Sequence, residues 1–402
     1  MDNRSRLVAL LGALCLLGPL SIDTYLPAFP GIARDFGSTE SQIQLSLTTF
    51  IIGLSVGQLL VGPLSDSWGR RRPLLVGIGC YVVMSVFCAV APSALALSGL
   101  RLLQGIGVAA GFVVAMAVAR DRFEGLAMAR FMSMMMLVNS LGPVVAPVLG
   151  GQLLRFTSWR GTFVVLAVIG LVLLVTLAVG LPETLPRDKR RPANLLLTLK
   201  VFGGLLADRK FLGYALASAL ALGSLFGYVA GASFVLQGVY GLTPQQFSLV
   251  FGANSVAIVL AGLLNTRLTG RIMPRSLLKA GLAGAAVGGF GLLAGGLVGG
   301  GLATFLPPLF VLTMSVGLLM PNAGALAMAR HPEAAGSASA VLGVTTFLVG
   351  GLMAPLVGAG GSASVLPMVT VMAGATTLAV LLFATMTRGD VGITRETESA
   401  PA

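Results

Sequence analysis

Two charged residues are assigned to the interior of long apolar runs rather than to their cytoplasmic or external ends, and a charge is costly there. Asp23 falls in the run at 7–27, and Arg101 falls in the run at 94–119. An Asp at the centre of a membrane helix costs about 2.5–3.5 kcal/mol, so it is retained where it faces a cavity or a partner. Burial and a nearby cation act in opposite directions on the proton affinity of a carboxyl. Asp23 and Arg101 are therefore a candidate proton-coupling pair, although either could instead reach the external membrane interface.

The other reactive residue types form no catalytic or metal-binding pattern. The one histidine, His331, falls in a predicted loop, and the three cysteines lie in apolar runs without metal-ligand spacing. The chain has no Gly-x-x-x-x-Gly-Lys-Ser/Thr motif for binding nucleotide phosphates. We predict no metal and no cofactor, with a proton as the coupling ion. An intramembrane enzyme is a distant alternative, because no nucleophile motif has its base.

The composition indicates that these residues belong to an integral membrane protein. Of 402 residues, 56% are hydrophobic and 10% are charged, whereas a soluble domain carries about 25% charged residues. Apolar runs of about 20 residues can cross the bilayer as helices. The runs lie at 7–27, 42–64, 73–92, 94–119, 127–151, 160–181, 211–237, 245–268, 277–298, 303–328, 334–359 and 364–386.

The basic residues fix the expected orientation of these twelve spans. With a cytoplasmic N-terminus, 22 of the 26 Lys and Arg residues fall on the cytoplasmic side, as the positive-inside rule requires. We expect a multi-pass protein of a bacterial cytoplasmic membrane, with both termini in the cytoplasm. The net charge of +12 is spread over these short loops, which argues against nucleic acid as a partner.

The charged, Pro-containing stretch at 182–210 divides the spans into two sets of six. We predict an N-terminal bundle at 1–181, a cytoplasmic linker at 182–210, a C-terminal bundle at 211–387 and a cytoplasmic tail at 388–402. The segment Gly262 to Arg271 follows the second helix of its bundle as Gly62 to Arg70 does in the first. This similarity indicates a diverged copy of the same loop, as expected for two repeated bundles. A chance similarity in a chain with 54 glycines is the alternative.

The segment from Gly62 to Pro73, GPLSDSWGRRRP, lies between the second and third spans. It resembles the loop signature of the major facilitator superfamily, although Ser67 stands where an Arg is usual and the Arg run has one extra member. The resemblance implies twelve helices in two six-helix bundles and a gating loop. A loop that only fixes topology is the alternative. The gating residues implied are Gly62, Asp66, Gly69, Arg70 and Arg71, and we expect Gly62 to permit close helix approach.

Two further segments resemble the same superfamily. RLLQGIG at 101–107 is similar to the segment that places a buried Arg in the first bundle. The segment NSLGPVVAPVLGG at 139–151 resembles the helix of antiporter members, and its glycines and prolines could also serve packing alone. The antiporter-type residues are Gly142, Pro143, Pro147, Gly150 and Gly151.

Three segments narrow the resemblance to Bcr/CflA-type drug-resistance exporters: SIDTYLPAFP at 21–30, Pro321 with Asn322, and AGSASA at 335–340. The resemblance implies alternating access and antiport of a drug against protons. The second bundle has no ionisable residue well inside a span, which suits an uncharged or weakly polar substrate. The expected cavity residues are Tyr25, Gln104, Asn139, Tyr228, Phe234, Asn254 and Asn322.

The sequence therefore predicts a monomeric secondary transporter, not an enzyme, whose partners are a small-molecule substrate and the lipid bilayer. Proton-coupled efflux of drugs is the favoured function. A proton-coupled importer or exporter of a natural metabolite on the same fold is the alternative, and a channel is disfavoured because nothing resembles a selectivity filter or charged ring. A membrane potential of 100 mV supplies about 2.3 kcal/mol per charge, enough for a roughly fifty-fold gradient of a neutral drug.

Overall fold

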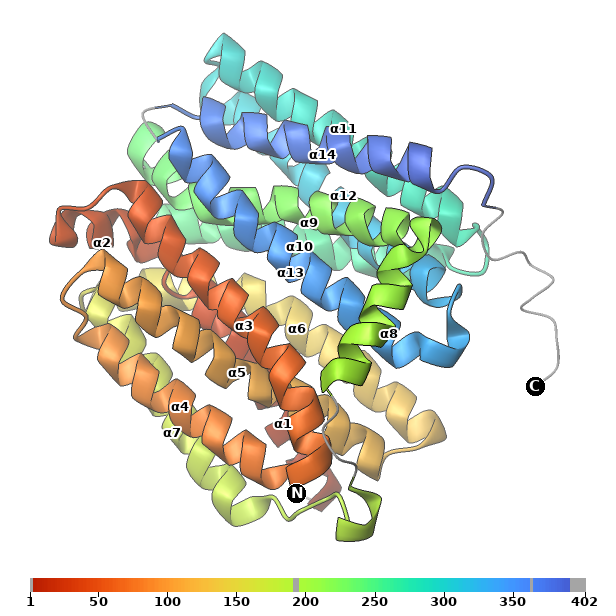
Figure 1. Cartoon of the computed structure of the whole chain (residues 1–402). Helices are drawn as coiled ribbons and strands as arrows, with labels where there is room; N and C mark the ends of the chain where they lie inside the picture. Colours follow the sequence, from red (N-terminus) through yellow and green to blue (C-terminus); the bar gives the residue numbers. More distant parts are fainter. Residues whose placement is uncertain (1–2, 191–194, 362–363, 391–402) are drawn as a thin grey trace. The chain divides into compact units, whose positions relative to one another are not determined.

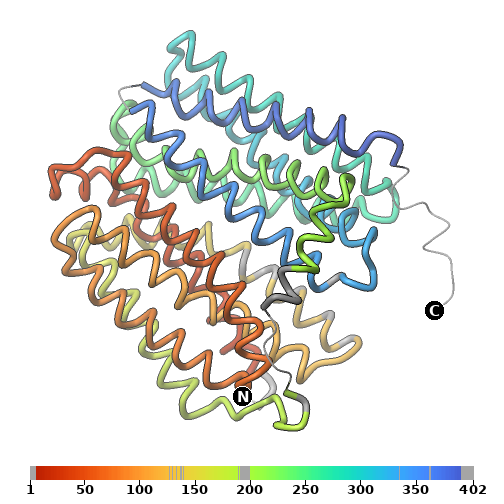
Figure 2. The backbone as a smooth tube through the Cα atoms, in the orientation of Figure 1, coloured from red at the N-terminus to blue at the C-terminus, as the bar shows by residue number. Residues whose placement is uncertain are grey.

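The computed structural model describes residues 3–190, 195–361 and 364–390, and its regular elements in these ranges are helices (Figure 1). Eleven of them are long and apolar enough to span a membrane, and α6 adds a shorter apolar segment, Ser140–Leu153. The prediction of an all-helical, twelve-span membrane fold is confirmed. Figure 2 follows the same path as a tube from the N-terminus to the C-terminal end.

The chain divides into two compact units, one of residues 1–195 with 241–252 and one of residues 196–240 with 253–402. The predicted bundle and linker boundaries stay predictions, and residues 391–402 of the predicted tail lie outside the described part. The first unit contains α1 (Asn3–Asp23), the 3-10 turn Leu26–Ala28, α2 (Phe29–Phe36), α3 (Glu40–Trp68), α4 (Arg71–Ala89), α5 (Ala94–Arg122), α6 (Gly125–Leu153), α7 (Trp159–Gly180) and the 3-10 turn Arg187–Lys189.

The second unit holds the later helices, and α10 begins within the stretch that groups with the first unit. Its α9 runs without a break into a π-helical turn, Val235–Val239. The helices are α8 (Leu195–Ala207), α9 (Arg209–Phe234), α10 (Pro244–Leu268), α11 (Pro274–Val298), α12 (Gly301–Met328), α13 (Ala335–Ala359) and α14 (Leu366–Met386), with a 3-10 turn at Pro332–Ala334.

Local sequence sets several helix ends. Thr39 caps α3 through a reciprocal pair with Gln42, in which each side chain accepts the other residue's backbone N–H. Ser93 caps α5, and Asp208 caps α9 by accepting the N–H groups of Lys210 and Phe211. These polar side chains supply acceptors that the first turn of a helix lacks, so the long apolar helices start at defined residues.

Glycines on α5 let two neighbouring helices approach it closely. A Cβ at Gly105 would collide with the backbone carbonyl of Phe50 on α3, and a Cβ at Gly107 would lie 2.8 Å from the carbonyl oxygen of Gly77 on α4. On α3, Gly53 faces the carbonyl of Leu102 in the same way. Small residues that allow backbone contact are typical of membrane helix interfaces. This packing fixes α5, which carries Arg101, between α3 and α4.

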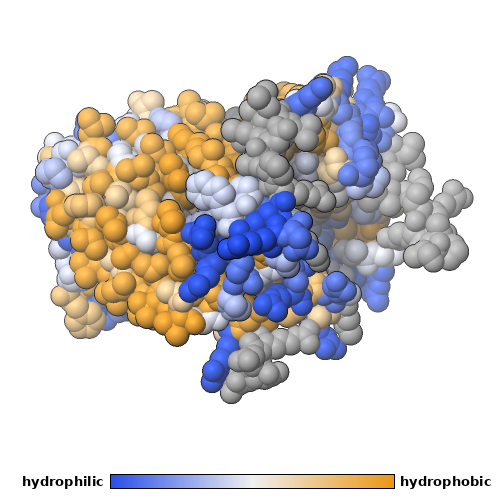
Figure 3. Space-filling model, turned by 60° about the horizontal axis from the view of Figure 1, so that its bottom comes forward, coloured by the Kyte–Doolittle hydropathy of each residue, from blue (hydrophilic) through white to orange (hydrophobic). Residues whose placement is uncertain are grey.

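The outward faces of the first unit are apolar. On α7, Val164, Val168, Val172, Val175 and Val179 are each more than half exposed. Their spacing of three to four residues puts them on one side of the helix. Figure 3 shows hydrophobic residues over much of the visible face, with hydrophilic residues gathered toward one side. A surface of this kind is stable only against hydrocarbon, which agrees with the membrane fold.

Candidate functional site

Asp23 is the last residue of α1, and it is buried. Pro27 and Pro30 follow closely, and the chain continues as a 3-10 turn and then α2. The side chain is 5% exposed, and within the described ranges no hydrogen bond or ion pair reaches its carboxyl group. Its burial argues against the alternative of a helix-end Asp reaching the membrane interface. A buried carboxyl without a cationic partner is costly in its charged form. Such a group can therefore gain or lose a proton when its surroundings change.

Arg101 is fully buried in a cage of aromatic rings and neutral acceptors. Its guanidinium carbon lies 4.0 Å from the ring centre of Phe50, 4.4 Å from that of Tyr25 and 5.7 Å from that of Phe163. It donates to the carbonyl oxygen of Ser21 at 2.9 Å. Cation–π contacts of this kind are worth about 2 kcal/mol when desolvated. The complete burial rules out the alternative in which Arg101 extends to the outer interface.

A chain of hydrogen bonds connects this cage to α4. Arg101 donates to Gln104 Oε1, and Gln104 Nε2 donates to Ser85 Oγ at 2.7 Å. On the opposite side, Ser21 Oγ and Tyr81 Oη share a hydrogen bond of 2.8 Å. Residues from α1, α4 and α5 are thus joined around one cation. Gln104, predicted as a cavity residue, belongs to this network.

Tyr25 is also fully buried, and its hydroxyl shares a hydrogen bond of 3.1 Å with Ser46 of α3. Its ring packs edge-on against Phe29 at 4.9 Å between centres. The predicted cavity residues Tyr25 and Gln104 therefore meet at Arg101. The third cavity residue predicted in this bundle, Asn139, has a side chain outside the described part of the structure.

The expectation that Asp23 pairs with Arg101 is not met. Arg101 binds the backbone of Ser21, two residues before Asp23, and no ion pair joins the two charged side chains in the described ranges. Each helical residue is rotated by about 100° from the last, so positions 21 and 23 point about 200° apart. Ser21 faces α4 through Tyr81, and Asp23 faces elsewhere on α1. Arg101 therefore holds the backbone of α1 near Asp23 without contacting the Asp23 carboxyl.

Arg70 is the centre of the predicted gating loop. Its guanidinium forms an ion pair with Asp66, one of 3.0 Å with Asp121 at the end of α5, and a hydrogen bond of 3.0 Å with Ser65. Burial disfavours its charge, but the hydrogen bonds that it donates to Asp121 and Asp66 outweigh that cost and raise the pKa of Arg70. These contacts tie α3, α4 and α5 together at one end of the first unit. Arg70 is thus the member of the Arg run that pairs with Asp66.

Glu183 joins this cluster from beyond α7, and no sequence motif indicates its role. Its carboxylate accepts the backbone N–H groups of Arg70 at 2.8 Å and Arg71 at 3.3 Å. Partial burial raises the pKa of Glu183, but the N–H groups of Leu185, Arg70 and Arg71 outweigh this effect and hold the pKa below its usual value. The guanidinium of Arg71 donates to the carbonyl of Ala178. A single carboxylate caps the start of α4.

The two glycines of the loop have different roles. Gly69 has φ of +90°, and a Cβ there would collide with the Glu183 carboxylate, so both conformation and space require glycine. Gly62 was expected to permit close helix approach, but a Cβ there would meet nothing within 4 Å among the described residues. The expectation that Gly62 permits close helix approach is therefore wrong. Gly270 in the second unit also has a positive φ, +80°, at the place that the proposed repeat assigns to it.

The glycines of α6 lie against the end of α1. A Cβ at Gly142 would lie 2.5 Å from Pro19 Cβ, and one at Gly150 would collide with the carbonyl oxygen of Thr24, next to Asp23. Gly151 faces Ser248, which groups with the same unit. Pro143 and Pro147 lie inside the helix. This segment therefore sets how α1 and α6 pack beside Asp23, while its predicted antiporter role stays a prediction.

The predicted cavity residues of the second unit are buried. Asn254 lies opposite Thr313, whose hydroxyl is 3.5 Å from its Oδ1. Asn322 donates to Asn265 Oδ1 at 2.6 Å and to the carbonyl of Leu318 at 2.7 Å, so its amide joins α12 to α10. Tyr228 and Phe234 lie on α9 and are 1% and 3% exposed. Asn254 and Asn322 thus contact neighbouring helices within the unit, and their role toward a substrate stays a prediction.

A second charged cluster, which the sequence did not reveal, lies in the second unit. Arg330 forms ion pairs with Asp208 at 2.9 Å and Asp390 at 3.5 Å, and His331 Nε2 lies 3.0 Å from Asp208. Partial burial raises the pKa of Asp208, but Arg330 and the N–H groups of α9 lower it to about 2. Arg330 lies 122 residues from Asp208 and 60 from Asp390 along the chain, so no local motif indicates the cluster.

Comparisons with known proteins agree with this architecture. A family model described as Major Facilitator Superfamily matches residues 11–355. The MFS-type transporter YdgK of Bacillus subtilis (strain 168) is 41% identical over 392 residues, 97% of each chain. A bicyclomycin resistance protein homolog of Haemophilus influenzae is 32% identical over 93% of this chain and 94% of that protein.

Among solved structures, a bacterial homolog of the human lysosomal transporter Spinster, inward-facing and occupied, matches with a TM-score of 0.76. It covers 96% of both chains at 16% identity, so it supports the fold alone. The family and its transporter relatives identify a multi-pass secondary transporter and exclude the intramembrane enzyme. The chain belongs to the major facilitator superfamily and, within it, to the Bcr/CflA-type drug-resistance transporters.

Proposed function

We propose that this protein exports small, uncharged or weakly polar drugs across the bacterial inner membrane in exchange for protons. The observation that carries the proposal is the buried carboxyl of Asp23, which has no ion-pair partner within the described ranges. The relatives that bear drug-resistance names support the class of substrate. Both termini then lie in the cytoplasm, on the side that holds most of the basic residues.

Asp23 is the proton carrier in this proposal, and Arg101 is a fixed charge that holds the backbone of the same helix. An isolated carboxyl in an apolar site binds a proton when water is excluded and releases it when water enters. Arg101 stays protonated throughout, because a guanidinium does not lose its proton in proteins. It donates to the carbonyl of Ser21, so it holds the end of α1 that carries Asp23. Arrival of a substrate that hydrates or displaces Asp23 would release the proton.

The gating loop and the antiporter-type helix serve this cycle by restraining the ends of the helices. Arg70 joins α3, α4 and α5 through Asp66 and Asp121. The Asp66 side chain is more than half exposed, so water can replace its contact with the buried Arg70 at low cost. Gly150 keeps α6 against the residue that follows Asp23. A rigid first unit that moves as one body is what alternating access requires.

The decisive experiment replaces Asp23 by Asn, which keeps the size and hydrogen bonding of the protonated acid but cannot release a proton. Addition of substrate to wild-type proteoliposomes in weak buffer changes the pH, and Asp23→Asn should give no such change while still binding the drug. Asp35→Asn is the matched control, because Asp35 is an exposed residue paired with Arg160. Full resistance and proton release by Asp23→Asn would refute the proposal, and Asp66 and Asp121 would be the next candidates.

The substrate class is tested separately. Expression in a pump-deficient bacterial host, followed by a resistance panel of phenicols, bicyclomycin, sulfonamides and dyes, measures which compounds are exported. We expect resistance to at least one uncharged or weakly polar compound and its loss in Asp23→Asn. Accumulation of a natural metabolite by energised cells, without resistance to any drug of the panel, would favour the metabolite transporter on the same fold.

A further inference from the structure

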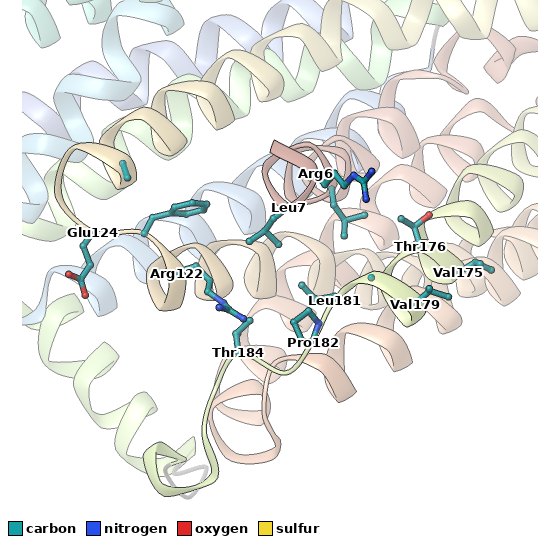
Figure 4. Close-up of a pocket in the computed structure, with 14 residues that line it drawn as sticks. Arg6, Leu7, Arg122, Glu124, Val175, Thr176, Val179, Leu181, Pro182 and Thr184 are labelled. Carbon is teal, nitrogen blue, oxygen red and sulfur yellow. The ribbon is translucent and has the colours of Figure 1, made fainter. Parts of the chain in front are cut away.

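A large cavity opens at the end of the first unit where α1 begins and where α5 and α7 end. Its volume is about 1060 Å³, at the upper end of the roughly 300–1,000 Å³ of small-molecule pockets. Figure 4 shows its wall, formed by residues of α1, of the α5–α6 turn and of the end of α7. Neither Asp23 nor any ring of the Arg101 cage is among its lining residues. The cavity is therefore separate from the proton-coupling site.

Two arginines at this cavity form no ion pair with any residue that the structure describes. Arg6 lies at the start of α1 and Arg122 is the last residue of α5, and both side chains are exposed. Within the described ranges neither of them forms an ion pair or a side-chain hydrogen bond. Glu124 also borders the cavity, but in Figure 4 its carboxylate points away from both arginines. The cavity thus presents two uncompensated positive charges.

Apart from Glu124, Thr176 and Thr184, the rest of the wall is apolar, and it continues into the bilayer-facing surface. Leu7 and Leu10 line it from α1, and Val175 and Val179 line it from α7. Val175 is 54% exposed and Val179 is 88% exposed. The exposed valines of α7 continue along the same side of the helix as far as Val164. A ligand with an anionic head and a long apolar tail would satisfy both parts of this surface at once.

We propose that this cavity binds an anionic phospholipid of the adjacent leaflet, with its phosphate at Arg6 and Arg122 and an acyl chain along α7. Basic pockets between membrane helices recognise phosphate headgroups in this way. Arg6 is the first residue of one span and Arg122 is the last residue of another. Both arginines therefore lie at the depth of the lipid headgroups. The charge and the apolar track together favour a lipid over a soluble anion.

The test measures lipid retention by native mass spectrometry of detergent-purified protein titrated with phosphatidylglycerol or phosphatidylcholine of the same acyl chains. Each basic residue near an anionic headgroup strengthens lipid binding by a similar factor. Removing both charges in Arg6→Gln with Arg122→Gln should therefore lower retention of phosphatidylglycerol about 30-fold at low salt. Retention of phosphatidylcholine should change little. Arg120→Gln with Arg130→Gln is the matched control, because both are exposed arginines that do not line the cavity.

A second variant distinguishes loss of the two charges from loss of the folded structure. Arg6→Lys with Arg122→Lys keeps both charges, so it should retain phosphatidylglycerol within a few-fold of wild type. Melting temperatures of all variants are measured alongside. Equal retention of the two lipids by wild type, or loss in the lysine variant while it stays folded, would overturn the proposal.

Soluble competitors identify other occupants. Inorganic phosphate and glycerol phosphate at millimolar concentration should not displace phosphatidylglycerol, because they lack the acyl chain that α7 contacts. Displacement by either would reassign the cavity to a soluble anion and overturn the lipid proposal. Displacement by a transported drug would reassign it to the substrate pathway, with the same consequence.

Discussion

The buried polar groups of the two units differ in kind. The first unit buries three charged side chains, Asp23, Arg70 and Arg101, whereas the second buries only neutral polar ones in its described part. Arg101 sits among rings and neutral acceptors, and the comparable polar contact of the second unit is the amide pair Asn265 and Asn322. Two sets of helices with a common architecture thus carry different electrostatics.

This difference suggests a division of work between the units. A buried charge is costly to retain, and its presence in one unit points to a function that neutral groups cannot perform. An amide pair satisfies its own hydrogen bonds and needs no counter-ion, so it mainly fixes the packing of α10 against α12. We interpret the first unit as the site of proton coupling and the second, whose buried polar side chains are neutral in its described part, as a scaffold. Four changes test that interpretation.

The largest effect is expected from Arg101→Gln. The variant loses cation–π contacts with Phe50 and Tyr25 and the charge-assisted bond to Ser21. Each of these is worth about 1.5–3 kcal/mol in a buried site, so we expect drug-driven proton movement to fall about 100-fold or more. Proton flux in proteoliposomes measures this. Arg101→Lys, which keeps the charge but not the planar fork, should be intermediate. Wild-type flux in Arg101→Gln would remove the contrast between the units.

Next in size is Gly150→Ala, which places a methyl group against the carbonyl oxygen of Thr24. Because backbone cannot move aside cheaply, overpacking here should cost about 1–3 kcal/mol and lower the melting temperature in detergent. Gly324→Ala on α12 is the matched control in the second unit. Its Cβ meets nothing within 4 Å, and replacing a helical glycine by alanine should raise stability by up to about 1 kcal/mol. Equal melting temperatures for the two variants would contradict the tight packing of α1 against α6.

An effect of similar size is expected from Asn322→Leu. The change leaves the buried amide of Asn265 without its 2.6 Å partner, at a cost of about 1–3 kcal/mol. Replacing both residues by Leu removes both polar groups, so the double variant should be more stable than the single one. A double-mutant cycle of melting temperatures measures the coupling. Additive losses would show that the two amides do not depend on each other.

The smallest effect is expected from Asp208→Asn. Asn can still cap α9, so the loss is the ion pair with Arg330, worth about 0.5–1 kcal/mol for a side chain 20% exposed. The pKa of Asp208 is lowered from 3.8 to about 2, so its stabilisation is complete above about pH 4 and disappears as the pH falls through about 2. Melting temperatures of wild type and variant should therefore converge over that range. A difference that stays constant down to about pH 2 would exclude this ion pair as its cause.

The spans could be predicted because run length and flanking charge are sequence properties. The run at 42–64 became α3, Glu40–Trp68, and the run at 94–119 became α5, Ala94–Arg122. The short helices α2 and α8 were not predicted. The first follows Pro27 and contains Pro30, and the second has 13 residues, too few to span a membrane.

The partners of the buried charges could be predicted only in part. Asp66 and Arg70 lie four residues apart on the two sides of the short turn between α3 and α4, so the sequence alone indicates that they are close. Asp23 was expected to pair with Arg101 because it is the only acidic residue well inside a span. The guanidinium instead binds a carbonyl, an amide and three rings, and such neutral acceptors leave no pattern in the sequence.

The cage around Arg101 has a consequence for the electrical behaviour of the transporter. Arg101 contributes one permanent positive charge, so the summed charge of Arg101 and Asp23 is zero when Asp23 is ionised and +1 when Asp23 is protonated. One elementary charge moved through 100 mV changes the free energy by about 2.3 kcal/mol. Only the half of the cycle that carries a protonated Asp23 would then respond to voltage. Pre-steady-state currents on a solid-supported membrane would follow the proton-loaded half-cycle, while the drug-loaded half-cycle for a neutral compound would be electrically silent.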